Sequence, residues 1–261
     1  MSIITTNDLT FLKAALVNKS IPKPSSGTLS GHAAGEPFDK FVEKALAFKF
    51  PNNIKRQYSF LNELFLNNPL VTSLEGRANL IESSVARFLL MRGRDAVTKW
   101  NENNLFEEKQ NDTADILYVE DSQKFTIIDV KTTNLGKDAQ APNIISSEKL
   151  AKACKFMIDK DDYDSISIVY IGIDWELNAE KTQLVCKDVF IKDLFKSDPT
   201  KIYINWAAAL QIQFKVQQLE QNFQGTRADW CKAYIKKYAT SFKEHTYKKL
   251  EQLKDFEKYI T

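Results

Sequence analysis

Two runs of β-branched and aromatic residues, joined by a short polar segment, constrain the fold of this chain more than any other feature. The runs are 111–119 and 125–131, and the segment between them is Glu-Asp-Ser-Gln-Lys. This pattern predicts a β-hairpin, because strands favour such residues and hairpin loops favour polar ones. A turn centred on Ser122 pairs Asp115 with Asp129 across the two strands.

The same register gathers three charges at one point of the hairpin. Directly opposed residues point to the same face of a sheet, with Cβ atoms roughly 5 Å apart, so Asp115 and Asp129 become neighbours. Lys131 lies two residues beyond Asp129 and shares that face. Two adjacent carboxylates repel each other unless a cation lies between them, and Mg²⁺ prefers carboxylate oxygens. Because a nearby ammonium can stabilise charge developing on a phosphate, the pattern predicts metal-assisted phosphodiester hydrolysis.

A more ordinary interpretation of these charges is a cross-strand salt bridge on an exposed hairpin face. An acidic residue two positions before a lysine arises often by chance, and Glu107-Glu108-Lys109 is a second example outside any predicted strand. Two features favour the catalytic interpretation. The register opposes the two aspartates, and the strands are otherwise apolar on both faces. The charges are therefore expected inside a buried sheet, where charge is rarely kept without a function.

Composition limits the class of protein without identifying it. A chain of 261 residues that is 43% hydrophobic can bury a sizeable core, as one large domain or one domain with an appendage. The formal net charge is only +2, so a nucleic-acid partner would require a local basic surface. Cys154, Cys186 and Cys231 are far apart in sequence, which favours buried thiols in a reducing compartment. With no signal peptide or apolar membrane span evident, we expect a cytoplasmic protein without a membrane partner.

Hydrophobic periodicity predicts helices on both sides of the hairpin. They are expected at 7–17, 36–48, 57–66, 77–91, 144–157, 205–223 and from Thr226 or Asp229 to about Tyr259. Arg92-Gly93-Arg94 is expected to end the fourth of these helices, its cations serving either the helix C-terminus or a phosphate contact. Two further strands are predicted at 165–173 and 183–190. Together these elements predict a mixed α+β fold with a central mixed β-sheet flanked by helices.

Six segments, in the same order along the chain, resemble the HincII/HindII restriction endonucleases. They are 27–38, 104–115, 141–146, 174–178, 203–209 and 225–227. The similarity runs nearly end to end, so it is more specific than the Asp…Asp-x-Lys pattern alone. It implies a type II restriction endonuclease of the PD-(D/E)xK superfamily, as a single domain over residues 1–261 with helical N- and C-terminal extensions.

The activity implied by the resemblance is Mg²⁺-dependent cleavage of double-stranded DNA by a homodimer. Such enzymes cut a short palindromic site, here six base pairs of the GTYRAC type, and leave blunt ends with 5′-phosphates. Carried over by position, Asp115, Asp129 and the backbone carbonyl of Val130 would bind the metal, and Lys131 would be the catalytic lysine. The superfamily motif often has proline before the first aspartate. This chain has Ala114 there, which the HincII/HindII family allows.

The resemblance also implies contacts with DNA. The residues concerned are Arg94, Gln110, Gln140, Ala141, Asn143, Tyr203 and Asn205. Gln140 would insert into the base stack at the central pyrimidine–purine step, which is cheap to unstack. Asn143 would read the central purine and Asn205 an outer base edge, because an asparagine amide can pair with purine edges. The family has an arginine after the catalytic Lys-Thr, whereas this chain has Thr133.

Two other functions remain open at this point. A structure-specific repair or junction nuclease of the same fold would cut according to DNA structure rather than sequence. A non-catalytic DNA-binding protein on a degraded nuclease fold would bind DNA without cutting it. The presence of Asp115, Asp129 and Lys131 together favours the nucleases.

Overall fold

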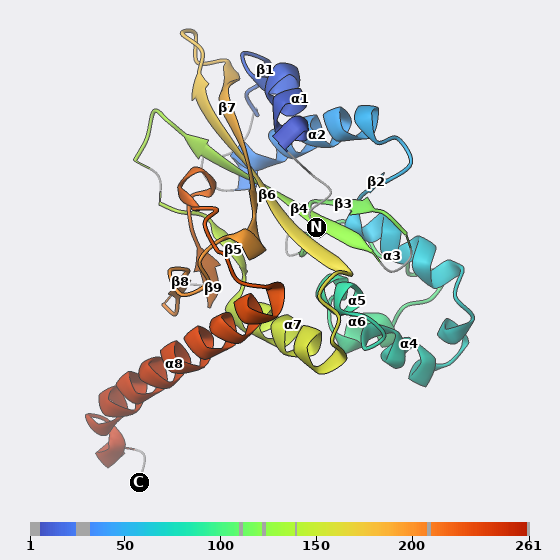
Figure 1. Ribbon diagram of the computed structural model, residues 1–261, viewed down its shortest axis with the longest axis vertical. Coiled ribbons are helices and arrows are strands. Elements are labelled where there is room, and N and C mark those ends of the chain that lie inside the picture. The colour runs from blue at the N-terminus through green and yellow to red at the C-terminus, as the bar shows by residue number, and fades with distance from the viewer. Residues whose placement is uncertain are drawn as a thin grey trace.

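The structure is a computed structural model that describes residues 6–24, 32–109, 112–121, 124–138, 140–207 and 210–259. Its centre is a six-stranded sheet of order β1-β7-β6-β4-β3-β2 (Figure 1). The strands are β1 (Ser20–Pro22), β2 (Ile54–Lys55), β3 (Ile116–Val119), β4 (Phe125–Asn134), β6 (Ile166–Leu177) and β7 (Gln183–Asp193). β4 and β6 run parallel, whereas every other neighbouring pair in this sheet is antiparallel. The predicted mixed sheet is therefore confirmed.

Helices flank this sheet on both sides. They are α1 (Thr6–Leu16), α2 (His32–Lys49), α3 (Gln57–Leu66), α4 (Leu74–Ile81), α5 (Val85–Leu90), α6 (Arg94–Thr98), α7 (Ser147–Lys160) and α8 (Arg227–Lys254). Short 3-10 turns occupy Pro69–Thr72, Leu194–Lys196, Val216–Gln218 and Glu257–Tyr259. In Figure 1, α1 and α2 lie above the long strands and α5 to α7 below them, while α8 extends away from the other elements. No helix in the described part of the chain is long and apolar enough to cross a membrane.

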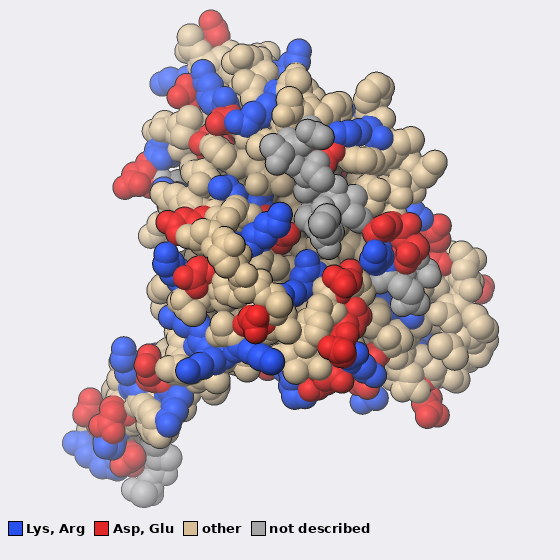
Figure 2. Space-filling model, viewed as in Figure 1, with Lys and Arg blue, Asp and Glu red and all other residues tan. Residues whose placement is uncertain are grey.

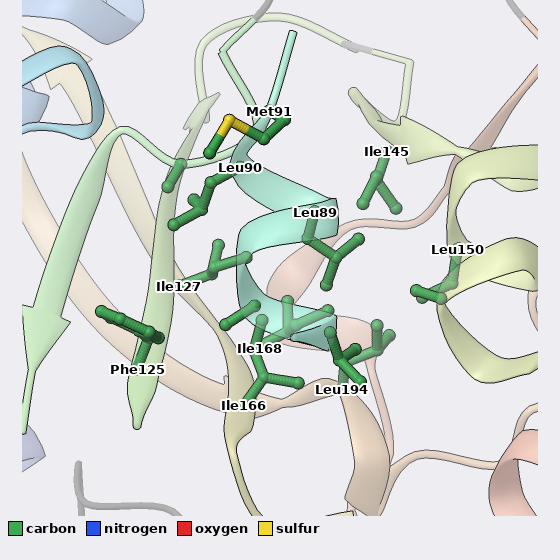
Figure 3. Packing of buried hydrophobic residues seen from close by; sticks show 14 of the residues in the cluster. Leu89, Leu90, Met91, Phe125, Ile127, Ile145, Leu150, Ile166, Ile168 and Leu194 are labelled. Carbon is green, nitrogen blue, oxygen red and sulfur yellow. The ribbon is translucent and has the colours of Figure 1, made fainter. Parts of the chain in front are cut away.

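Both faces of the hairpin strands are buried, as their apolar composition predicted. Leu117 and Ile127 belong to a cluster that α3, α5, α7 and α8 complete, part of which Figure 3 shows. Ile116 and Ile128 belong to a second cluster, beneath α1 and α2. Residues of the two clusters alternate along each strand, because successive side chains of a strand point to opposite faces of the sheet. A charged residue in β4 is therefore surrounded by apolar packing.

A second, three-stranded sheet has the order β5-β9-β8. It consists of β5 (Asn143–Ser146), β9 (Gln211–Gln213) and β8 (Tyr203–Asn205). The helix predicted over 205–223 is therefore wrong. Polar residues alternate there with Ile204 and Ile212, which are 4% and 0% exposed, and this period of two belongs to strands. Leu210 also has a left-handed backbone (φ 51°), which a helix does not accommodate.

The helix predicted over 77–91 is also wrong, because the segment forms two shorter helices. α4 ends at Ile81, and α5 starts after Ser84, whose side chain accepts a hydrogen bond from the backbone N–H of Arg87. Serine favours such a cap over a helix interior. Gly93, with φ of 97°, precedes α6, so the Arg92-Gly93-Arg94 segment begins a helix instead of ending one.

The remaining predicted elements agree more closely with the structure. The helix predicted from residue 144 begins at Ser147, because β5 takes up the β-branched residues before it and Ser146 caps the helix. α3 has the predicted bounds 57–66. α8 begins after Thr226, one of the two residues expected to open it, and Asp229 completes a capping box with Thr226. The three cysteines are buried and free, as predicted.

Candidate active site

The hairpin has the register that the sequence predicted. Val119 pairs with Phe125 and Ile116 with Ile128, so residues 115 and 129 are the next opposed pair. Asp115 lies directly before β3, and its Oδ2 accepts a hydrogen bond of 2.9 Å from the backbone N–H of Val130. That bond fixes the carboxylate of Asp115 against β4, beside Asp129.

Lys131 completes the cluster. Its Nζ donates to Oδ1 of Asp129 at 2.5 Å, and the side chain of Asp129 is only 8% exposed. Burial raises the pKa of Asp129 well above its usual range, Lys131 pulls it down, and the charge of Asp115 raises it again. Burial lowers the pKa of Lys131, but Asp129 and Asp115 outweigh burial and the net change is a rise. Lys131 therefore stays protonated in this site.

The donor set of this cluster fits a hard divalent cation. Two carboxylates and a single ammonium leave one negative charge uncompensated in a partly buried place, which is costly. Mg²⁺ is held in many sites by one or two carboxylates, waters and substrate phosphate, so Asp115 and Asp129 suffice. No group of three or more His, Cys, Asp or Glu side chains gathers in the described residues, so a metal in the hairpin would take its other ligands from backbone oxygens, waters or substrate. The pair of carboxylates in the hairpin is the candidate metal site.

Arg56 and Gln57, which sequence reasoning missed, hold the segment that leads into Asp115. The buried side chain of Gln57 donates to the carbonyl of Leu90 at 2.8 Å and accepts from the backbone N–H of Ala114 at 2.9 Å. Arg56 donates to the carbonyl of Asp115 at 3.1 Å. These contacts join residues more than 30 positions apart, so no local sequence pattern marks them. The sequence signal was limited to a polar pair at the start of the helix.

The small sheet brings together three of the residues predicted to contact DNA. Asn143 and Tyr203 both pair with Gln213, and Asn205 pairs with Gln211. Opposed residues share a face, so Asn143, Tyr203 and Asn205 lie on one side of the sheet, away from the buried isoleucines. Tyr203 is 61% exposed on this side. The face is rich in amide groups, which suit the edges of bases.

A contact within this face was also missed from the sequence. Nε2 of Gln213 donates to Oδ1 of Asn143 at 2.6 Å. Because the amide oxygen of Asn143 is engaged, its NH₂ group is the part left to donate to a ligand. The predicted helix over 205–223 concealed this pairing, since only a strand places Gln213 beside Asn143.

The other predicted DNA contacts lie in several places. Gln140 is exposed and Ala141 half-buried in the segment that enters β5. Arg94 is exposed at the first position of α6 and is not part of the small sheet. Gln110 lies outside the described residues, as do residues 27–31 of the glycine-containing segment 27–38. Lys and Arg side chains gather over the start of α8 in Figure 2, whereas both charge signs mix over the rest of that face.

Comparison with known proteins identifies the family. The family model described as restriction endonuclease HincII matches residues 12–260. The type II restriction enzymes HindII and HincII, both from Haemophilus influenzae, are each 48% identical over 250 residues, covering 95% of this chain and 96% of each relative. The solved structure of NlaIV restriction endonuclease is more distant, with 10% identity, coverage of 94% and 91%, and a TM-score of 0.40. The chain belongs to the HincII family of type II restriction endonucleases.

Proposed function

We propose that this chain is a Mg²⁺-dependent endonuclease that cuts double-stranded DNA within a palindromic six-base-pair site of the GTYRAC type. Cleavage leaves blunt ends with 5′-phosphates. The observation that carries the proposal is the cluster of Asp115, Asp129 and Lys131, with Asp129 buried, in a chain of this family. Residues 1–261 act as one endonuclease domain with helical extensions, in the cytoplasm.

In the proposed mechanism, Asp115, Asp129 and the backbone carbonyl of Val130 hold Mg²⁺. When bound, the ion would supply a Lewis acid for the scissile phosphate and would lower the pKa of its water. Lys131 is oriented by its hydrogen bond with Asp129. Lys131, whose pKa the two aspartates raise, would stabilise negative charge developing on the phosphate. The backbone N–H of Val130 holds the carboxylate of Asp115 in position to bind the metal.

DNA is proposed to contact the face formed by β5, β9 and β8. Asn143 reads the central purine and Asn205 an outer base, while Tyr203, Arg94, Gln110 and Ala141 help to hold the duplex. Gln140 enters the stack at the central step. The exposure of Tyr203 and Gln140 and the shared face of the two asparagines support this arrangement.

The active form is proposed to be a homodimer, because a two-fold assembly matches a palindrome and places one metal centre on each strand. The second half of α8 offers a candidate interface. It exposes the large apolar side chains Phe242, Tyr247, Leu250 and Leu253. Sedimentation at several protein concentrations measures this state directly, and a monomer bound to palindromic DNA would contradict it.

The proposed activity is tested by incubating plasmid DNA with the purified protein in Mg²⁺ and in EDTA. Discrete fragments are expected with Mg²⁺ and intact plasmid with EDTA. A non-catalytic DNA-binding protein would shift the plasmid on a gel in both conditions without cutting it.

Gln140→Ala is expected to change the preference for the central step more than overall affinity. If Gln140 selects the step by unstacking it, the variant no longer unstacks that step. Its cutting rate then depends less on how easily the step deforms. The relative cutting rates of duplexes that differ only at the central two base pairs are expected to change by roughly 10-fold, in line with about 1–3 kcal/mol for a base-pair change. Unchanged relative rates would remove this role from Gln140.

Gln213→Leu is expected to reduce discrimination at the central purine by about 10-fold, because the amide of Asn143 is no longer held in one orientation. Gln213→Glu adds a sharper test. A carboxylate accepts but does not donate, so Asn143 is expected to turn its NH₂ toward Glu and present its oxygen to the base. Rates on substrates with altered central purines measure both effects. Gln218→Leu, at an exposed glutamine of the Val216–Gln218 turn, is the control and should keep the wild-type preference.

A further inference from the structure

A cavity of about 650 Å³ opens among α4, α5, α6 and α7, beside Asp112 and Thr113, which precede β3. Its walls come from α4, residues 91–96, the first turns of α7, and Lys109, Asp112 and Thr113. Thr113 in its wall stands two residues before Asp115, and Ser146, also in the wall, is the last residue of β5. The cavity therefore adjoins the segment that leads to Asp115 and the end of β5, which belongs to the proposed DNA-binding face.

Cations exceed acids in the lining. The charged residues are Arg92, Arg94, Lys109, Lys149 and Lys152 on one side and Glu82, Asp112 and Glu148 on the other. Two of the acids are already neutralised, Asp112 by Arg92 at 2.6 Å and Glu148 by Lys152 at 2.7 Å. Removing these two pairs from the five cations and three acids leaves three cations and one acid. The cavity therefore favours a negatively charged occupant.

Lys149 is the most unusual of these cations. Its Nζ donates to the hydroxyl of Thr113, and within the described residues it forms no ion pair with a carboxylate. Burial lowers the pKa of Lys149 to about 8, and the charge of Asp112 only partly offsets this. An ammonium has three donors, of which the hydroxyl takes one. A partly buried cation without a charge partner costs stability, and such groups gather at functional sites.

We propose that this cavity binds a backbone phosphate of the DNA duplex, with Lys149 and Arg94 as its cationic contacts. The inference rests on the proposed function, since it concerns how the same duplex is held. A phosphodiester carries one negative charge and oxygen acceptors, which matches the excess cations and the unused donors of Lys149. The Lys149–Thr113 hydrogen bond then joins the phosphate contact to the segment that ends in Asp115.

Lys149→Met tests the proposal, because it keeps most of the side-chain volume and removes the charge. Affinity for a duplex containing the cleavage site is measured without Mg²⁺ over a range of KCl concentrations. The slope of log K against log salt is expected to become shallower by about one per subunit. Lys155→Met is the matched control. Lys155 lies on the same helix with its side chain 70% exposed and outside the cavity, so its loss should leave the slope nearly unchanged.

Thermal unfolding separates this role from a structural one. Without DNA, Lys149→Met is expected to raise Tm by a few degrees, because an unpaired partly buried charge is removed. A lower Tm with an unchanged salt slope would mean that Lys149 is structural and would overturn the proposal. A rise in wild-type Tm on adding inorganic phosphate, with the slope still unchanged in the variant, would assign the cavity to a free anion and also overturn it. A wild-type chain that neither binds nor cuts DNA would instead contradict the proposed function.

Discussion

Asp129→Asn is expected to lower the rate of plasmid cleavage by roughly 10³-fold or more while leaving DNA affinity within a few-fold. Asparagine keeps the shape of the side chain but removes the negative charge that a metal ligand at this buried position requires. The same change removes the charged acceptor that orients Lys131. The metal site and the catalytic lysine are therefore both disturbed, whereas the proposed DNA-binding face formed by β5, β9 and β8 is not.

The Asp129 experiment combines cleavage rates in Mg²⁺ with gel shifts in Ca²⁺. Thermal unfolding adds a readout that does not depend on cutting, because Ca²⁺ should raise Tm of the wild-type chain but not of the variant. Asp188→Asn is the matched control. Asp188 is an exposed carboxylate paired with Lys13, so its variant should cut at close to the wild-type rate. Wild-type cutting by Asp129→Asn would exclude the hairpin cluster as the metal site.

Gln57→Leu is expected to cost about 2–4 kcal/mol in the free energy of unfolding. The change leaves the carbonyl of Leu90 and the N–H of Ala114 buried without their side-chain partner, and each such group costs about 1–3 kcal/mol. Because Ala114 precedes Asp115, cleavage by the folded variant should also fall by at least about 10-fold, since a small displacement of a catalytic group is costly. Chemical denaturation and cleavage rates below the unfolding transition measure the two effects.

Asn62→Leu separates instability from misplacement of Asp115. Asn62 lies on the same helix and also bridges backbone groups, donating to the carbonyl of Phe106 at 2.8 Å and accepting from its N–H at 2.7 Å. It does not contact the segment that holds Asp115. Its variant should lose comparable stability yet cut at nearly the wild-type rate once folded. Equal loss of cleavage in both variants would show that Gln57 acts through stability alone.

The hairpin was predictable because its determinants are local. Two apolar runs and a polar turn fix both the strands and their register, and the register alone opposes Asp115 and Asp129. The start of α8 was predictable for the same reason, since the Thr226 and Asp229 capping box lies within four residues. These are features in which neighbouring residues decide the structure.

The small sheet was not predictable from local pattern. A strand of three residues is too short for its alternation of polar and apolar residues to be distinguished from a helical pattern. The segment 205–223 also contains alanine and glutamine, which favour helices. Tertiary packing of Ile204 and Ile212 overrides that preference. The contacts of Gln57 and of Lys149 with the hairpin were hidden for a related reason, because each joins segments that only the folded chain brings together.

Sequencing both ends of the fragments released from a DNA library of known sequence tests the central claim most directly. The account predicts that every Mg²⁺-dependent break falls at one six-base-pair palindrome, with both strands cut opposite each other at its central step. Breaks at junctions, mismatches or single-strand boundaries, irrespective of sequence, would contradict it and favour a structure-specific nuclease of the same fold.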